Sequence, residues 1–324
     1  MNIIKNIYKI AKNKFSMIVL PEAATCERVL KAGLSAAKMG LAKIIILGGE
    51  NEKKYGNSNI KVIDINAYEN YAILKSRLLE KRSSKGLTEE DAEQLLKDPI
   101  YFATMLVECG YADGMGAGAI TETANVFRPA LQIIKGREGV KTISSSMILT
   151  DKSINNKANA LLLSDIAMVE NPSGEQLAEI AIETARTCKD VLEMPPVVAF
   201  LSYTTKSGKE VEVNKTIKEA MKILDEKNVD FVYDGEMQVD AALDSVTAAI
   251  KAPDSPVKGA ANCLIFPNIV AGNIGYKLMR TSGRWNAIGP ICQGLNKPIS
   301  DVSRGATEEE ILITIALTAS KKNI

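Results

Sequence analysis

Apolar positions along the chain follow two alternating periods. Short apolar runs bounded by Gly, Pro or Asn predict buried strands, at 16–20, 43–47, 60–65, 140–149, 160–164, 197–202, 231–234 and 263–266. Between them, apolar residues spaced three and four apart predict helices, at 1–15, 25–39, 67–82, 88 onward, 100–108, 173–189, 213–227 and 269–281. This alternation is typical of an α/β protein with helices on the faces of largely parallel sheets.

The end of the chain combines turn signals with the start of a helix. Residues 289–310 read GPICQGLNKPISDVSRGATEEE, and turns are predicted at the GP and QG dipeptides. Thr307 and Glu310 have the spacing of a capping box in front of an apolar helix at 311–319. Taken alone, Glu310 is better explained as a helix cap than as a catalytic residue.

Ser303, Arg304 and Gly305 are expected in the loop that leads into this helix. A helix N-terminus offers unpaired N–H groups and the positive end of a dipole. A guanidinium beside it suits a phosphate or a developing oxyanion. The alternative for Arg304 is an ordinary surface ion pair.

A glycine-rich segment at 112–119, ADGMGAGA, is predicted to form a turn after a short strand. Such loops often hold phosphates, but this one lacks the G-x-x-x-x-G-K-[ST] pattern. Close packing of the backbone explains the glycines equally well, so both interpretations stay open.

Length and composition describe a globular protein with more than one domain. The chain has 324 residues, 46% hydrophobic and 24% charged. The net charge of +1 gives no overall field that would favour nucleic acid or an anionic membrane surface. No apolar run reaches the length of a membrane span. The lysine-bearing N-terminus is amphipathic and has no cleavage site, so we expect a cytoplasmic protein.

Cysteine and histidine counts limit the chemistry. The five cysteines are an odd number without C-x-x-C spacing, which argues against a disulfide framework or a zinc site. The chain has no histidine, so a Ser-His-Asp or Cys-His system cannot form. Acid–base chemistry would have to use Asp, Glu, Lys, Tyr or Cys, and no metal is expected.

The stretch IGPICQGLNKPISDVSRG resembles the C-terminal signature of the phosphotransacetylase family. Further stretches of the chain agree with that family: LPEAATCERVLKA, KGLTEEDAEQLLKDPIYFATMLV, FRPALQIIK, FLSYTTKSG and FPNIVAGNIGYK. The resemblance implies two α/β domains similar to the isocitrate and isopropylmalate dehydrogenases. Each domain would hold a mostly parallel sheet, with the active site in the interdomain cleft. The expected boundaries are 1–143 with 301–324 for the first domain and 144–300 for the second.

The family resemblance also implies a reaction. Acetyl would pass reversibly between acetyl-CoA and inorganic phosphate, giving acetyl phosphate and CoA in acetate metabolism, by direct attack of the CoA thiolate in a ternary complex. CoA would be a substrate, with no bound cofactor and no nucleic-acid or membrane partner. A homodimer is expected, which the apolar helix at 269–279 supports. Two alternatives remain: a phosphate butyryltransferase-like acyltransferase and a non-catalytic acetyl-CoA-sensing module.

Family roles fall on five residues. Ser303 would hydrogen-bond the CoA thiol, and Arg304 would bind phosphate and the carbonyl oxygen. Glu310 would be the base, at a place where the family usually has Asp. Arg128 and Arg82 would bind substrate. Without the resemblance, a loop ion pair explains Arg128 and helix-dipole stabilisation explains Arg82.

The segment 117–123 departs from the family pattern. The family commonly has a serine, glycine and alanine followed by a histidine and two threonines, whereas this chain reads AGAITET. Glu122 brings a negative charge that should repel phosphate. Either the activity tolerates this change, or the activity or acyl specificity differs.

Overall fold

The structure is a computed structural model that describes residues 3–151, 160–208 and 211–321. The chain divides into two compact units. We call Gly139–Gly294 the central unit, and Ile4–Glu138 with Leu295–Ile324 the terminal unit. The domain boundaries predicted at 143/144 and 300/301 stay a prediction.

The terminal unit contains a parallel sheet. Its strands are, in spatial order, β3 (Ile60–Ile63), β2 (Lys43–Leu47), β1 (Met17–Leu20), β4 (Gly114–Ala117) and β11 (Ile299–Asp301), and every neighbouring pair is parallel. Apart from the edge strand β3, in which Lys61 is exposed and Val62 half-buried, the strands are almost fully buried, as the interior of a parallel sheet requires. Because all five run the same way, their carboxyl ends share one edge, and the loops that follow them meet there.

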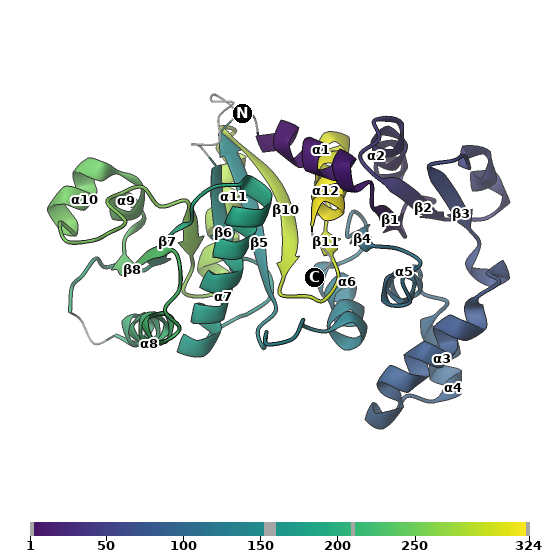
Figure 1. The fold of residues 1–324 in the computed structure, drawn as a ribbon, viewed down its shortest axis with the longest axis horizontal. Helices are drawn as coiled ribbons and strands as arrows, with labels where there is room; N and C mark the ends of the chain where they lie inside the picture. Colours follow the sequence, from purple (N-terminus) through teal and green to yellow (C-terminus); the bar gives the residue numbers. More distant parts are fainter. Residues whose placement is uncertain (1–2, 152–159, 209–210, 322–324) are drawn as a thin grey trace. The chain divides into compact units, whose positions relative to one another are not determined.

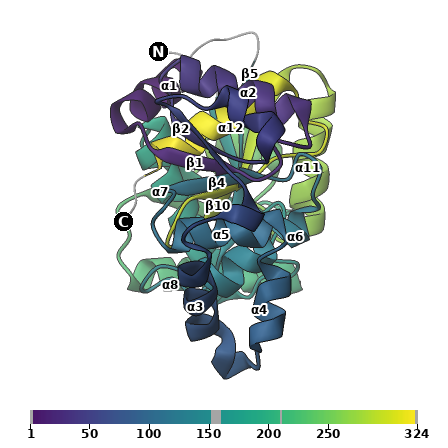
Figure 2. The same cartoon turned by 90° about the vertical axis from the view of Figure 1, so that its right-hand side faces the viewer.

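Helices cover both faces of the terminal sheet (Figures 1 and 2). One face carries α1 (Ile3–Lys14), α2 (Glu27–Lys38) and α12 (Glu308–Ser320), and α12 packs on α2, β1, β4 and β11. The other face carries α5 (Pro99–Glu108) and α6 (Thr123–Pro129), with α3 (Tyr71–Arg82) and α4 (Glu89–Leu95) beyond them. The helix predicted after Arg304 is confirmed as α12.

The turn predicted for 112–119 is wrong in its central part, because Gly114–Ala117 form β4. Small residues are required here by close neighbours. A Cβ on Gly114 would lie 2.8 Å from the carbonyl oxygen of Pro298 and 3.0 Å from a methyl carbon of Thr318. Gly114 thus lets this strand fit between β1 and β11, and the loop begins only at Gly118.

The central unit contains a mixed sheet. Its strands are, in spatial order, β10 (Trp285–Gln293), β5 (Ser144–Asp151), β6 (Ala160–Ser164), β9 (Cys263–Ile265), β7 (Val197–Leu201) and β8 (Val232–Met237). β5 is antiparallel to both of its neighbours, and the other pairs are parallel. The α/β class with largely parallel sheets is therefore confirmed, with β5 as the exception.

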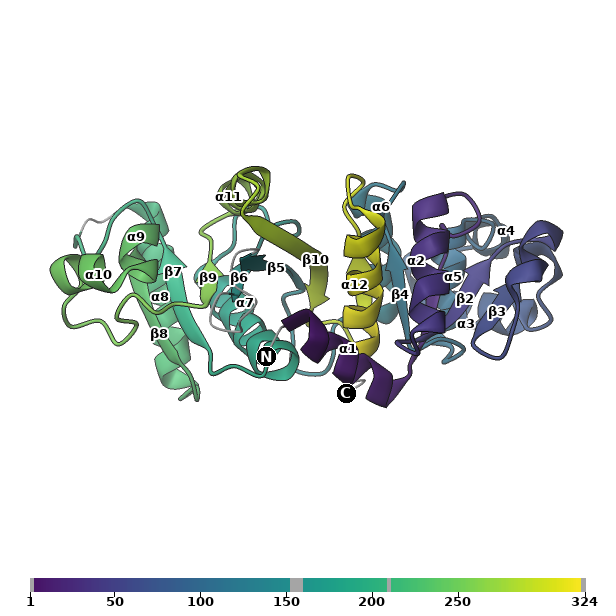
Figure 3. The same ribbon diagram turned by 90° about the horizontal axis from the view of Figure 1, so that it is seen from above.

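Helices flank the central sheet as well. α7 (Gly174–Thr187) packs on α8 (Glu212–Glu226), and Figure 3 shows α11 (Ile269–Thr281) on the opposite side of β5 and β6 from α7. The short helices α9 (Val239–Leu243) and α10 (Ser245–Lys251) lie near β7. The core between sheet and helices is apolar, with Met147, Leu163 and Leu264 among its buried residues.

The turn predicted at Gly289-Pro290 is also wrong. β10 continues through both residues, and its register against β5 shifts between Ile288 and Ile291. Gly289 has φ = +117°, a conformation that glycine adopts without strain. The dipeptide therefore makes an irregularity within a strand, as a β-bulge does, and the strand ends only at Gln293.

Candidate functional site

The N-terminus of α12 is closed by the predicted capping box, which is confirmed. Thr307 Oγ1 accepts a hydrogen bond from the Glu310 N–H at 3.2 Å, and Glu310 Oε2 accepts one from the Thr307 N–H at 2.8 Å. One oxygen of the Glu310 carboxylate is thus engaged in holding the helix end. Glu310 stays partly accessible, so a second role is sterically open to it.

The loop between β11 and α12 carries Ser303 and Arg304. Ser303 is half-buried and Arg304 is exposed. The guanidinium of Arg28, on α2, donates hydrogen bonds to the backbone carbonyls of Arg304 (3.2 Å), Ala119 (3.2 Å) and Ala306. Arg28 therefore fixes the backbone of this loop and leaves the Arg304 side chain free to reach outward. Sequence reasoning did not single out Arg28, because nothing local marks its partners.

The loop after β4 is organised by a buried carboxylate. Glu22 is 3% exposed, and its two oxygens accept hydrogen bonds from the backbone N–H groups of Gly118, Ala119, Ile120 and Thr121, at 2.8–3.2 Å. These N–H groups are the ones that a phosphate-binding loop would offer to its ligand. Since Glu22 occupies them, the structure favours backbone packing over a phosphate site for this glycine-rich segment.

Asp301 lies beneath this loop, at the last position of β11. Its side chain is 2% exposed, and Thr123 Oγ1 donates a hydrogen bond to its Oδ2 at 2.7 Å. The pKa of the Asp301 carboxyl is raised to about 7, chiefly by burial and also by the charge of Glu22, although the Thr123 hydroxyl, the nearby Val302 N–H and the charge of Arg304 act in the opposite direction. A carboxyl that titrates near neutrality next to Arg304 was not foreseen from the sequence.

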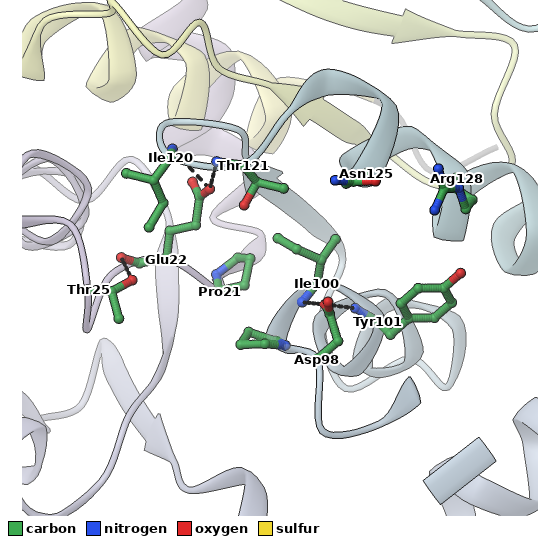
Figure 4. Close-up of a pocket in the computed structure, with 11 residues that line it drawn as sticks. Pro21, Glu22, Thr25, Asp98, Ile100, Tyr101, Ile120, Thr121, Asn125 and Arg128 are labelled. Atoms are coloured by element: carbon green, nitrogen blue, oxygen red, sulfur yellow. Dashed lines mark hydrogen bonds between the residues drawn. The ribbon is translucent and has the colours of Figure 1, made fainter. Parts of the chain in front are cut away.

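A pocket of about 330 Å³ opens beside these loops (Figure 4). Its wall combines the segment after β1, the start of α5, the loop after β4 and α6. The lining residues are Pro21, Glu22, Thr25, Asp98, Pro99, Ile100, Tyr101, Ile120, Thr121, Asn125 and Arg128. Asp98 caps α5 by accepting from the N–H groups of Ile100 and Tyr101, at 2.7 and 3.2 Å. The pocket is thus open to solvent and has both apolar and charged walls.

The charges of the two other predicted arginines both act on Tyr101. Arg128, in the last turn of α6, is exposed and lines the pocket; Arg82 ends α3 and is half-buried. Burial raises the pKa of the Tyr101 phenol, and the charges of Arg128 and Arg82 both lower it, with Asp98 acting in the opposite direction. The Tyr101 hydroxyl donates to Gln132 Oε1 at 3.0 Å. Two cations beside one phenol suit an anionic ligand.

The two groups of predicted site residues flank one loop. Arg28 connects Ala119 to the loop of Ser303 and Arg304, while Ile120 and Thr121 line the pocket that contains Arg128. Glu122, the charged residue in the segment that departs from the family pattern, is exposed at the N-cap of α6. Its side chain makes no capping hydrogen bond there. The predicted residues thus fall around the carboxyl edge of the terminal sheet.

The described residues offer neither a metal cluster nor a membrane-spanning helix. Within 3–151, 160–208 and 211–321, no cluster of three His, Cys, Asp or Glu side chains could hold a metal ion. Of the helices in these ranges, none is long and apolar enough to cross a membrane. The five cysteines all lie within these ranges, and none of them forms a disulfide.

Comparison with known proteins gives a consistent result. The family model described as phosphate acetyl/butaryl transferase matches residues 2–319. A phosphate acetyltransferase from Thermoanaerobacterium thermosaccharolyticum is 42% identical over 98% of this chain and 99% of its own length. A crystal structure of a phosphotransacetylase from Streptococcus pyogenes has a TM-score of 0.88 at 38% identity, covering 98% of each chain.

A more distant likeness concerns the fold alone. A 4-hydroxythreonine-4-phosphate dehydrogenase from Klebsiella pneumoniae has a TM-score of 0.55 at 13% identity, covering 94% of this chain and 100% of its own. The dehydrogenase-like architecture predicted from the sequence is therefore confirmed, whereas a shared fold does not transfer an activity.

Proposed function

The chain belongs to the phosphate acetyl/butaryl transferase family, and we propose on this basis that it is a phosphate acetyltransferase. It transfers acetyl reversibly between acetyl-CoA and inorganic phosphate. The observation that supports this most directly is the Ser303-Arg304-Gly305 loop, which Arg28 holds at the N-terminal end of α12 with Arg304 exposed. A guanidinium and a helix N-terminus together favour an anion at this point.

The proposed reaction needs no metal and no covalent enzyme intermediate. In the direction of acetyl-CoA synthesis, the CoA thiol loses its proton and the thiolate attacks the carbonyl carbon of acetyl phosphate. The C–S bond forms, the C–O bond to phosphate breaks, and phosphate leaves with the bonding electron pair. Ser303 hydrogen-bonds the thiol, Arg304 stabilises the tetrahedral oxyanion and the departing phosphate, and Glu310 accepts the thiol proton.

Acetyl phosphate formation from acetyl-CoA and phosphate tests this function directly. We expect turnover with acetyl-CoA that exceeds turnover with propionyl-CoA and butyryl-CoA, measured in parallel. Higher kcat/KM with butyryl-CoA would support the butyryltransferase alternative instead. Binding of acetyl-CoA without any turnover would support a non-catalytic sensing module.

Arg128 and Arg82 are proposed to bind the anionic groups of the substrates. Arg128→Ala and Arg82→Ala should each raise the KM of acetyl-CoA or phosphate by about tenfold and change kcat little, because a charge-assisted contact made equally before and during reaction contributes only to binding. Steady-state kinetics with each substrate varied gives the answer. Arg186→Ala, which removes an exposed Arg186–Asp190 pair of the central unit, is the matched control; unchanged KM values in both site variants would contradict the role.

We expect a homodimer, and α11 supports this. Val270, Ile274 and Leu278 lie four residues apart on one side of the helix, and are 63%, 54% and 67% exposed. A second copy of the chain could bury this apolar stripe. Light scattering should give twice the chain mass, and Ile274→Glu should shift the protein toward the monomer mass. A monomer mass for the unsubstituted chain at micromolar concentration contradicts the proposal.

A further inference from the structure

The Asp301 carboxyl, three residues before Arg304 in the chain, is buried with incomplete hydrogen bonding. Its Oδ2 accepts from Thr123, but its Oδ1 has no hydrogen-bond partner among the residues that the structure describes. The neighbouring Val302 N–H lowers the pKa of the carboxyl from close by, but its hydrogen bond goes to the carbonyl of Ala117, at 2.7 Å. Oδ1 packs against Gly118 so closely that a Cβ there would lie 1.9 Å from it. A buried oxygen without a partner is costly as a carboxylate and less costly once protonated.

Two charged residues in the described part of the chain act on the Asp301 carboxyl. Within the terminal unit, β11 packs against β4, α6 and α12. β4 is GMGA and has no titratable side chain, α6 contributes the Thr123 hydroxyl, and α12 approaches β11 through uncharged Thr318. The charges that act on the Asp301 carboxyl are the carboxylate of Glu22, which repels its ionised form, and the guanidinium of Arg304, which attracts it.

We propose that Asp301 is a positioning residue that takes up a proton when a phosphate dianion binds at Arg304. Without ligand, Arg304 partly balances the ionised Asp301. When a dianion binds, that balance is lost, because the same guanidinium is engaged by two new negative charges near the carboxylate. Protonation of Asp301 removes the repulsion. The inference rests on the proposed function, since it assumes that Arg304 holds the phosphate.

This proton uptake has a defined consequence for pH. The carboxyl titrates at about 7 in the free protein, so an arriving dianion meets a neutral Asp301 below that pH and an ionised one above it. Dianion binding should therefore weaken as the pH rises through neutrality. If one proton is taken up, the dissociation constant increases by on the order of tenfold between about pH 6 and about pH 8.

Sulfate is the probe that tests this, because it remains a dianion across this range while phosphate itself titrates. The inhibition constant of sulfate against phosphate is measured as a function of pH. We expect it to rise by on the order of tenfold for the unsubstituted protein, and to become nearly independent of pH in Asp301→Asn. Thr123→Val removes the hydrogen bond that favours the ionised form, so it should move the midpoint of the pH transition upward.

Four outcomes of these measurements would overturn the inference. A sulfate inhibition constant that stays flat with pH, or that rises equally in Asp301→Asn, overturns the inference. An unchanged midpoint in Thr123→Val also overturns it, and this variant serves if Asp301→Asn does not fold. Arg304→Ala distinguishes a failure of the proposed function from a failure of the inference. If sulfate inhibits this variant as strongly as the unsubstituted protein, Arg304 does not bind phosphate, and the inference fails as well. Inhibition that depends on Arg304 but not on pH overturns the inference alone.

Discussion

Arg304→Ala should lower kcat for acetyl phosphate formation by on the order of a hundredfold or more. The backbone of this loop is held by Arg28 through the carbonyls of Arg304 and Ala306, so removing the side chain should leave the loop in place. The variant then lacks only the positive charge that stabilises the oxyanion and the departing phosphate. Steady-state kinetics in both directions, together with a melting curve, measures the effect.

A surface ion pair predicts a different result for Arg304→Ala. Stability would change by about 1 kcal/mol or less, and turnover would remain nearly intact. Arg186→Ala provides that comparison, because Arg186 is a partly exposed arginine in the last turn of α7 that pairs with Asp190, four residues further along the chain. If both alanine variants retain full turnover, Arg304 has no catalytic role.

Glu310→Gln should lower kcat strongly at neutral pH without lowering the melting temperature. Gln can serve at the third position of a capping box, so the hydrogen bond to the Thr307 N–H is retained. The proton acceptor is lost. The defect should diminish at higher pH, because a thiol with a pKa of roughly 8.5 increasingly ionises without help. The pH profile of kcat separates this from a general loss of structure.

Glu309→Gln is the matched control, since Glu309 lies in the same first turn of α12 and is exposed. It changes the net charge and the helix-dipole interaction by the same amount as Glu310→Gln. Normal turnover of Glu310→Gln at neutral pH would leave Glu310 as a helix cap only. Equal losses in both variants would point to the charge of the helix end and not to a base.

The glycine-rich segment shows where local pattern was ambiguous. Its glycines fit both a phosphate loop and close packing, and the choice depended on Glu22, which lies 96 residues before Gly118 in the chain. Likewise, β4 could not be recognised, because its composition is set by Pro298 and Thr318, which approach it only in the folded protein. The dipeptide Gly289-Pro290 has a strong turn signal, yet pairing with β5 keeps it within a strand.

The sequence by itself determined the alternation of strands and helices, the capping box at Thr307 and Glu310, the absence of histidine chemistry, and the family. These depend on neighbouring residues or on composition, where periodicity, hydrogen bonding within one turn and side-chain chemistry act directly. Only the tertiary structure decided how the site is held. Arg28 and Arg304 are 276 residues apart in the chain, and the burial that raises the pKa of Asp301 comes from elements that pack around it. Partners and burial of this kind arise from folding, so no local pattern encodes them.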